Sequence, residues 1–407
     1  MSGTNYLDRL LDGVVVEWKA LGDVAEYVRG LVYSKSDETA DKNGYKVLRA
    51  NNITLPGNAL NFHDVKYVSQ AVNVKKGQWL RKDDILISAA SGSREHVGKI
   101  AYIKSNMDFC FGGFMGVVRC STSLAPRYLF HVLTSDLFKR YLDEMLNSST
   151  INNLNSSVMG GFNIPIPCPD NPRKSLTIQA EIVRVLDTFA ELTAELTAEL
   201  TAELTARKKQ YQHYRDQLLR FEDGEVEWKT LGEVAEIGTG SHDTQDAIEE
   251  GDYVFYARGR EPLKLDIFDF DETAIITAGD GAGVGKVFHY AQGKYALHQR
   301  AYRIVPREVM EPRFIYHYFA SQFLPYIQKA SVSSSVTSLR RPMFVNFPVP
   351  APPLAEQARI VAILDKFDAL TNSLSEGLPR EIALRQKQYA YYRDLLLSFP
   401  KSEELAR

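Results

Sequence analysis

The chain has few cysteines, no long apolar run and no surplus of positive charge. Its three cysteines, Cys110, Cys120 and Cys168, form no CxxC pair and no disulfide framework, which fits a reducing cytoplasm. No apolar run approaches the ~20 residues that a membrane-spanning helix needs, and the N-terminus lacks the layout of a secretory signal. The eight histidines include no HxH or HxxxH pair, so no zinc site is predicted. We expect a cytoplasmic chain without a membrane segment or a metal centre.

The charge balance limits how the chain could bind nucleic acid. At 407 residues it is long enough for two or three domains, and its net charge is −3. A nucleic-acid-binding protein that works alone usually carries a clear positive excess. Binding to DNA would therefore require basic residues gathered on one face, or a positive contribution from partners.

The strongest pattern present is an internal duplication. Three segments occur twice, and in the first pair nine of eleven positions are identical. The pairs are VEWKALGDVAE (Val16–Glu26) and VEWKTLGEVAE (Val226–Glu236), EIVRVLDTFAEL (Glu181–Leu192) and RIVAILDKFDAL (Arg359–Leu370), and RKKQYQHYRDQLLRF (Arg207–Phe221) and RQKQYAYYRDLLLSF (Arg385–Phe399). The regions between the pairs share only fragments. One scaffold used twice, with two different interiors, explains this pattern.

The beginning of the chain resembles the unit that ends it. YLDRLLDGVVVEW (Tyr6–Trp18) is similar to YRDQLLRFEDGEVEW (Tyr214–Trp228). This similarity predicts a closed arrangement whose two halves are related by a pseudo-two-fold axis.

Two long helices follow the two interiors. Apolar residues three or four apart after Glu181 and after Arg359 predict amphipathic helices, and the seven-residue spacing of Leu204, Tyr211 and Leu218 predicts a coiled-coil seam. A two-fold axis would place these helices side by side and antiparallel. In the second helix, Gly377 and Pro379 predict a break or a kink.

The first helix contains three tandem TAEL units over Thr193–Leu204. Each unit lengthens a helix by ~6 Å and turns its end by ~40°. One base pair turns by roughly 34–36°, so such a helix could space two DNA readers in whole base pairs. The alternative is an elongated bundle with a recent tandem duplication. The repeated glutamates are expected to lie on a solvated face, although a basic partner or the neighbouring helix remains an alternative.

The interiors are expected to be rich in β-strands. Short β-branched runs occur at Asp83–Ser88, Lys99–Ile103, Thr273–Ala278 and Ala301–Val305. Each interior ends in a proline-rich exit before its helix. The predicted fold class is α+β, with two β-rich domains separated by two long antiparallel coiled-coil helices in a pseudo-two-fold duplication.

With these motifs, essentially the whole chain resembles the specificity subunit of type I restriction–modification systems, in the subgroup with central TAEL repeats. The resemblance rests on the VEWxxLGE segments, EQARIVAILDKFDAL (Glu356–Leu370), the KQYxYYRDLLLSF seam and the TAEL units. It implies two target-recognition domains, each reading half of a bipartite double-stranded DNA site, and a spacer between them. It further implies docking of two modification (methyltransferase) subunits and of restriction/translocase subunits. S-adenosylmethionine, ATP and Mg are then expected on the partners and no cofactor on this chain, and three TAEL units imply the longer-gap form.

The expected domains follow from these boundaries. They are a closing segment at 1–15, target-recognition domain 1 at 16–175, a central spacer helix at 176–222, target-recognition domain 2 at 223–353 and a C-terminal spacer helix at 354–407.

Catalytic motifs are missing from the sequence. GDGAGVGK (Gly279–Lys286) departs from a phosphate-binding loop because Asp280 replaces the first glycine of that motif and Val287 its Ser/Thr, so a glycine-rich turn is predicted. The [N/D]PP[Y/F] motif of amino-methyltransferases is absent. We therefore predict a non-enzyme, and the alternatives are a coiled-coil scaffold, a stand-alone DNA-binding protein and a self-sufficient methyltransferase.

DNA contacts are predicted where directional donors and basic side chains gather in loops. For each residue the alternative is a solvated turn or a surface arginine. The candidates in the first half are Arg49, Asn51, Asn52, Ser93, Arg94, Lys99, Asn152, Asn153 and Asn155. Those in the second half are Arg258, Arg260, Arg300, Arg303, Ser334, Thr337, Arg340 and Arg341.

Overall fold

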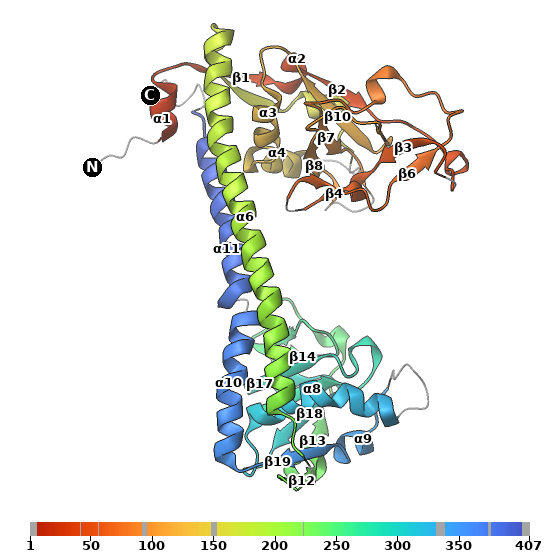
Figure 1. Cartoon of the computed structure of the whole chain (residues 1–407), viewed down its shortest axis with the longest axis vertical. Helices are drawn as coiled ribbons and strands as arrows, with labels where there is room; N and C mark the ends of the chain where they lie inside the picture. The colour runs from red at the N-terminus through yellow and green to blue at the C-terminus, as the bar shows by residue number, and fades with distance from the viewer. Residues whose placement is uncertain are drawn as a thin grey trace. The chain divides into compact units, whose positions relative to one another are not determined.

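The computed structural model describes residues 6–40, 42–55, 57–91, 96–147, 153–222, 224–330, 338–372 and 376–400. The chain forms two compact units (Figure 1). Unit 1 comprises Met1–Thr197 together with Ala383–Arg407, and unit 2 comprises Ala198–Ile382. Within the described ranges, no helix is both long and apolar enough to cross a membrane.

Unit 1 contains two main sheets and two short strand pairs. One sheet has the order β2-β10-β7-β8, the other has the order β6-β3-β9, and β1-β11 and β4-β5 are two-stranded. The strands are β1 (Val16–Ala20), β2 (Ala25–Arg29), β3 (Tyr45–Leu48), β4 (Ile53–Thr54), β5 (Ala59–Leu60), β6 (Lys66–Val68), β7 (Ile85–Ser88), β8 (Ile100–Tyr102), β9 (Cys110–Phe111), β10 (Met115–Cys120) and β11 (Asn163–Pro167). The strands predicted near Ile85 and Ile100 are confirmed.

The short helices described in unit 1 are α1 (Tyr6–Leu11), α2 (Leu21–Val24), α3 (Pro126–Leu133), α4 (Asp136–Asn147) and α5 (Ser156–Gly160). Of these, α2, α3 and α5 pack against strands of the four-stranded sheet. Leu7 of α1 belongs to the same buried cluster as Ile182 and Leu396. The Trp18 indole Nε1 also donates a hydrogen bond to the Pro400 carbonyl at 3.2 Å. The start and the end of the chain therefore pack into one core.

Unit 2 builds a similar arrangement around one continuous sheet of six strands, in the order β13-β18-β16-β17-β14-β15. Its strands are β12 (Glu227–Thr230), β13 (Ala235–Thr239), β14 (Tyr253–Tyr256), β15 (Leu263–Leu265), β16 (Phe270–Ala278), β17 (Phe288–Leu297), β18 (Ala301–Pro306) and β19 (Pro348–Ala351), and its short helices are α7 (Leu231–Val234), α8 (Pro312–Ala330) and α9 (Arg341–Val345). The runs expected at Thr273 and Ala301 form β16 and β18.

The proline-rich exits before the two helices form β-strands. β11 pairs with β1, placing Trp18 opposite Pro165, and β19 pairs with β12, placing Trp228 opposite Pro350. Each pair is only two strands wide. A proline therefore leaves its missing N–H on an outer edge, where no ladder hydrogen bond is lost.

The long helices follow these ribbons. α6 (Pro172–Leu218) is continuous over 47 residues, because the TAEL units contain strong helix formers and neither glycine nor proline. The second helical segment is divided into α10 (Leu354–Asn372) and α11 (Gly377–Leu396). Gly377 has φ +74°, and a Cβ there would lie 2.5 Å from the Ala369 carbonyl oxygen. The predicted break at this glycine is confirmed.

Equivalent side chains fasten α6 to unit 1 and α10 to unit 2. On α6, Asp187 accepts hydrogen bonds from Arg127 Nε at 2.9 Å and from His131 Nε2 at 2.8 Å. On α10, Asp365 accepts the matching bonds from Arg313 at 2.8 Å and from His317 at 2.7 Å.

A buried glutamine precedes each aspartate by two helical turns. Gln179 Oε1 accepts a hydrogen bond from the Ala125 N–H at 2.8 Å, and Gln357 Oε1 accepts one from the Glu311 N–H at 2.7 Å. The duplicated frame inferred from the sequence thus appears as duplicated contacts.

Candidate nucleic-acid interface

In each unit a backbone bridge joins the residues after a sheet strand to a segment in which the sequence predicted DNA contacts. In unit 1, Ala90 forms an antiparallel bridge with Asn153, and the Leu154 N–H donates to the Ala89 carbonyl at 2.6 Å. In unit 2, Asp280 forms the same bridge with Ser338. There the Leu339 N–H donates to the Gly279 carbonyl at 2.7 Å. The described residues at each bridge therefore lie side by side.

Beside the bridge in unit 1 lies a turn at Gly112–Phe114, between β9 and β10. Arg29 reaches both features: its guanidinium donates to Asn153 Oδ1 at 3.1 Å and to the Gly113 carbonyl at 3.0 Å. The Phe114 carbonyl accepts the Ala89 and Ala90 N–H groups at 2.8 and 3.0 Å. The backbone of this turn is consequently fixed from two sides.

Two apolar side chains project from this fixed turn. Phe114 is 73% exposed and Val32 is 83% exposed. They belong to one surface, since a Cβ placed on Gly113 would lie 3.2 Å from Val32 Cγ2. Sequence reasoning missed both residues; the available signal was the glycine pair before an aromatic in FGGFMG. Exposed apolar groups beside polar loops can contact a thymine methyl or wedge between base steps.

The candidates around Arg49 form a hydrogen-bonded cluster. Arg49 Nη2 and Asn51 Nδ2 each lie 2.7 Å from Asp64 Oδ2. Asn52 has 0% exposure, and its Oδ1 accepts the Arg49 N–H at 2.8 Å. A side chain without exposed surface does not reach a base. The direct DNA contact expected for Asn52 is therefore corrected: Asn52 positions Arg49. The cluster adjoins the turn, because the Gly112 N–H donates to the Leu48 carbonyl.

The other candidates in unit 1 have varied surroundings. Asn155 caps helix α5, its Oδ1 accepting the Val158 N–H at 2.9 Å, and its side chain is exposed. Lys99 is half-buried at the start of β8. Ser93, Arg94 and Asn152 lie outside the described residues, as do Ser334 and Thr337 of unit 2.

In unit 2 one carboxylate joins two of the candidate arginines. Arg258 Nη1 donates to Asp280 Oδ1 and Arg300 Nη1 donates to Asp280 Oδ2, both at 2.9 Å. Burial raises the pKa of Asp280, but the hydrogen bonds from Arg258 and Arg300 outweigh burial and lower the pKa. Asp280 is ionised at neutral pH, and the group carries one net positive charge. The expected glycine-rich turn is confirmed, since Asp280 precedes the short 3-10 helix η6 (Gly281–Gly283).

The remaining candidate arginines of unit 2 differ in their exposure and in whether they form ion pairs. Arg303 pairs with Glu236 and Glu272, and it lies over the Phe270 ring at 4.4 Å, so its side chain is occupied on the sheet. Arg260, Arg340 and Arg341 are exposed, and Arg340 is the residue before helix α9. Arg340 and Arg341 follow the bridge at Ser338 in sequence.

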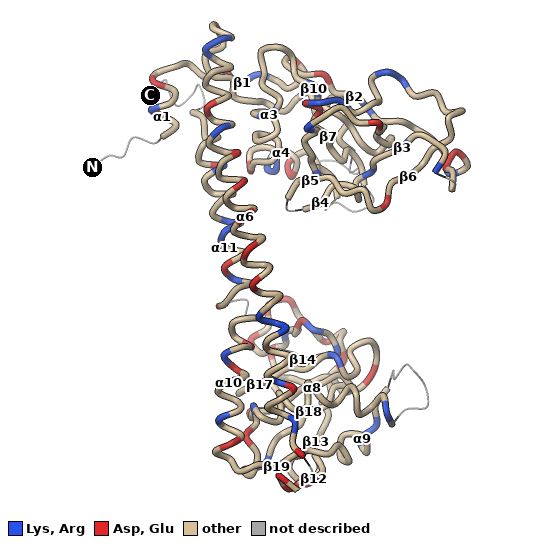
Figure 2. The backbone as a smooth tube through the Cα atoms, viewed as in Figure 1, with Lys and Arg blue, Asp and Glu red and all other residues tan. Residues whose placement is uncertain are grey.

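Charge of one sign does not cover either long helix. Figure 2 shows lysine and arginine mixed with aspartate and glutamate along α6 and α11. The glutamates of the TAEL units are exposed, as expected for a solvated face, and Arg207 lies 3.4 Å from Glu203. Positive charge that could meet DNA is therefore carried by separate clusters on the two units.

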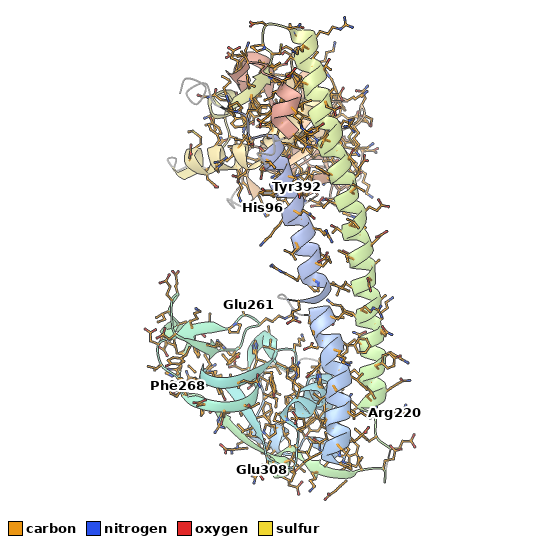
Figure 3. The ribbon with its side chains drawn as sticks, turned by 90° about the vertical axis from the view of Figure 1, so that its left-hand side faces the viewer. His96, Arg220, Glu261, Phe268, Glu308 and Tyr392 are labelled. Atoms are coloured by element: carbon orange, nitrogen blue, oxygen red, sulfur yellow. The ribbon has the colours of Figure 1, made fainter. Side chains whose placement is uncertain are left out.

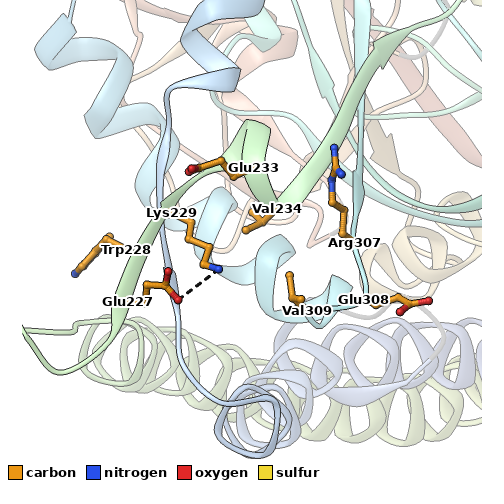
Figure 4. A pocket seen from close by; sticks show the side chains of 8 residues that line it. All are labelled: Glu227, Trp228, Lys229, Glu233, Val234, Arg307, Glu308 and Val309. Atoms are coloured by element: carbon orange, nitrogen blue, oxygen red, sulfur yellow. Dashed lines mark ion pairs between the residues drawn. The ribbon is translucent and has the colours of Figure 1, made fainter.

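Each unit contains a surface cavity. A cavity of about 550 Å³ in unit 2 is lined by residues that include Trp228, Lys229 and Arg307, and Lys229 pairs with Glu227 at 3.3 Å inside it (Figure 4). A second cavity, in unit 1, lies beside Trp18 and Phe162. Across the ranges that the structure describes, no three His, Cys, Asp or Glu side chains gather as a metal site would require.

The chain resembles known proteins over most of its length. The model of a family described as "Type I restriction modification DNA specificity domain" matches residues 15–206 and 224–384. The chain is 36% identical to the type I restriction enzyme EcoR124I/EcoR124II specificity subunit of Escherichia coli, over 100% of both chains. It is 34% identical to the EcoprrI specificity subunit of Escherichia coli, over 92% of this chain and 93% of the relative.

One solved structure supports the fold. It comes from a study of complex assembly and conformational transition of the type I R-M system, and it covers 94% of this chain and 97% of its own chain. The TM-score is 0.64 at 17% sequence identity, so this likeness concerns the fold alone.

Proposed function

The chain belongs to the type I restriction–modification DNA specificity family, and from this membership we propose how its two units recognise DNA. Specificity subunits of these systems are non-catalytic DNA-recognition subunits. Unit 1 and unit 2 each carry one target-recognition domain, and each reads one half of a bipartite double-stranded site. The domains run over 16–175 and 223–353, with a closing segment at 1–15 and spacer helices at 176–222 and 354–407.

The observation that carries this proposal is the bridge repeated in the two units with different residues. Ala90 and Asn153 meet in unit 1, and Asp280 and Ser338 occupy the same places in unit 2. The backbone hydrogen bonds are the same, whereas the side chains differ in charge and in size. A shared frame with unlike side chains fits two sensors for two different half-sites.

We assign base reading to a set of side chains in each unit. In unit 1 they are Arg49, Asn51, Lys99, Asn153, Asn155 and Phe114, together with Ser93, Arg94 and Asn152. In unit 2 they are Arg258, Arg260, Arg300, Arg340 and Arg341, together with Ser334 and Thr337. A mixture of guanidinium, amide and apolar groups supplies phosphate contacts and directional contacts to base edges.

The spacer is a pair of antiparallel coiled-coil helices belonging to the subgroup with TAEL repeats. Equivalent aromatic contacts support this pairing. The ring of Phe189 on α6 contacts that of Tyr392 on α11, with ring centroids 5.8 Å apart. Tyr392 is labelled in Figure 3. In unit 2, Phe367 of α10 meets Tyr214 of α6 at 5.5 Å. With three TAEL units, the chain spaces its half-sites in the longer-gap form.

The partners are two modification subunits that dock on the helices, and restriction/translocase subunits. S-adenosylmethionine, ATP and Mg bind to those partners and not to this chain, and the complex works in the cytoplasm. The net charge of −3 supports a dependence on partners, because the chain alone offers little electrostatic attraction to DNA.

Mapping methylated bases tests the proposal. A host that expresses this chain with its modification subunits should carry methyl groups at one bipartite sequence with an unread gap. The same host with the modification subunits alone should lack that pattern. Methylation that does not depend on this chain, or DNA binding that persists without any sequence preference in the full complex, would refute the proposed role in favour of a scaffold.

A further inference from the structure

We propose that Asp280 is a positioning residue that holds Arg258 and Arg300 as a paired reader of guanine in the half-site bound by unit 2. This inference rests on the proposed function and deepens it, because it names a base. It starts from three side chains that approach one point from different parts of the sheet.

The three side chains come from the ends of neighbouring strands. Arg258 follows β14, Asp280 follows β16, and Arg300 lies in the turn between β17 and β18. The Gly279 N–H donates to the Arg300 carbonyl at 2.8 Å. The strands β18, β16, β17 and β14 are consecutive in one sheet, so the three residues follow strands of the same sheet.

Glycines allow the turn around Asp280 to press against both arginines. A Cβ on Gly283 would lie 2.5 Å from the Arg258 carbonyl oxygen, and one on Gly279 would lie 2.7 Å from the Arg300 carbonyl oxygen. A buried histidine supports the same turn, because His298 Nδ1 accepts the Arg300 N–H at 2.9 Å. The backbone of the pair is therefore held independently of the carboxylate, which leaves Asp280 to set the directions of the two guanidinium groups.

Each oxygen of Asp280 binds one arginine, and both arginines are more exposed than the carboxylate. The side chain of Asp280 is 20% exposed, whereas those of Arg258 and Arg300 are 40% and 63% exposed. Among the described residues, no other hydrogen bond involves either guanidinium. Each guanidinium therefore keeps N–H groups beyond the one bound to Asp280.

A guanidinium that is held beside a carboxylate suits the edge of a guanine. Guanine offers two acceptors, O6 and N7, whose spacing matches two N–H groups of one arginine. A carboxylate between the arginines repels a phosphate but can accept a hydrogen bond from the amino group of the paired cytosine. Unit 1 has Ala90 at the equivalent bridge position, so this device would be specific to the half-site of unit 2.

The test compares methylation maps for wild type, Arg258→Lys, Arg300→Lys and Asp280→Asn, each assembled with its modification subunits. Lysine keeps the charge but loses the fork, so each lysine variant should reduce preference for a guanine about tenfold to a hundredfold at one position of one half-site. Asp280→Asn should relax the same half-site while binding of non-specific DNA at low salt becomes tighter, because a negative charge is lost. Asp271→Asn, at an exposed position of β16 in the same unit, is the matched control: it removes the same charge and should leave the methylation map unchanged.

Several outcomes would overturn the inference. One is a uniform loss of methylation with the motif intact, which indicates a phosphate contact. The others are a relaxed preference in both half-sites and a half-site of unit 2 that contains no G·C pair. Thermal unfolding of each variant separates these results from misfolding. If wild type marks no bipartite site, the proposed function itself fails; if wild type marks one and all variants keep the same map, only the guanine pair fails.

Discussion

His131 Nε2 lies 2.8 Å from Asp187 Oδ1, and this hydrogen bond fastens helix α3 to α6 within unit 1. His317 and Asp365 repeat it between α8 and α10 of unit 2 at 2.7 Å. Both histidines are buried. Since burial favours a neutral imidazole, each ring donates its Nε2 hydrogen to the carboxylate and stays uncharged at neutral pH.

Acid should loosen these attachments. Burial lowers the pKa of His131, and positive Arg127 and Arg393 lower it further, although Asp187 acts against them. An unfolded histidine binds a proton below about pH 6.5, so the unfolded state takes up more protons and stability falls as the pH drops through that value. The free energy of unfolding should therefore decline from pH 7 to pH 5, by at most about 1.4 kcal/mol per pH unit for each histidine, and the melting temperature should fall with it.

Replacing His131 by glutamine keeps a donor for Asp187 and removes the titrating group. The decline between pH 7 and pH 5 should then be shallower than in wild type, as measured by thermal unfolding across that range. An equally steep decline in the His131→Gln, His317→Gln double variant would show that other groups govern the acid response. Burial raises the pKa of Asp187, but the hydrogen bonds from His131 and Arg127 outweigh it and lower this pKa to about 2. The contribution of Asp187 to stability is therefore lost only at still lower pH.

Gln179→Ala should destabilise unit 1 more than an ordinary surface change. The Gln179 side chain is fully buried and accepts the Ala125 N–H at the start of α3. Without it this backbone group has no partner, which costs about 1–3 kcal/mol. Denaturant unfolding measures the loss, and Gln212→Ala, at an exposed position of the same helix, is the control with an expected change within about 0.5 kcal/mol.

Deleting Thr201–Leu204 should shorten the unread gap by about one base pair. The deletion removes one TAEL unit and turns the following part of α6 back by ~40°, close to one step of duplex turn. Methylation mapping with the modification subunits reads the gap directly. Replacing the same four residues by four alanines keeps the helix length and should leave the gap unchanged, whereas a deletion variant with the original gap would rule out a ruler.

Phe114→Ala should impair recognition without weakening the fold. Phe114 is 73% exposed, so its loss should change the free energy of unfolding by no more than about 0.5 kcal/mol. We expect a relaxed preference in the half-site read by unit 1 only, seen in the methylation map. Val15→Ala, at another exposed apolar position of unit 1, should leave the map as it is. A change in the other half-site would place Phe114 outside the recognition face.

Much of the frame could be predicted from sequence because local patterns determine it. The TAEL units specify a helix through propensity alone, and Gly377 marks the break between α10 and α11. The strands at Ile85 and Ile275 follow from β-branched runs. The duplicated segments also predicted the repeated attachment, although not the chemistry of Arg127, His131 and Asp187.

The candidate site was less predictable because long-range pairing creates it. Arg29 reaches Asn153 across 124 positions of the chain. Asp280 collects arginines from two separate strand ends, and the sequence showed only a glycine-rich turn there. Asn52 looked like a surface amide, but the fold of the Asp64 segment buries it. The exits at Pro165 and Pro350 form strands by pairing with β1 and β12. These partners lie far away in sequence, so local patterns did not predict the strands.

The ribbon β1–β11 ends with Ala20 opposite Asn163, and β12–β19 ends with Thr230 opposite Pro348. The first and last residues of each interior thus lie next to each other at the end of a two-stranded ribbon. Recombination at these two points would replace a whole interior, and with it the proposed half-site, while the helices and their attachments stay unchanged.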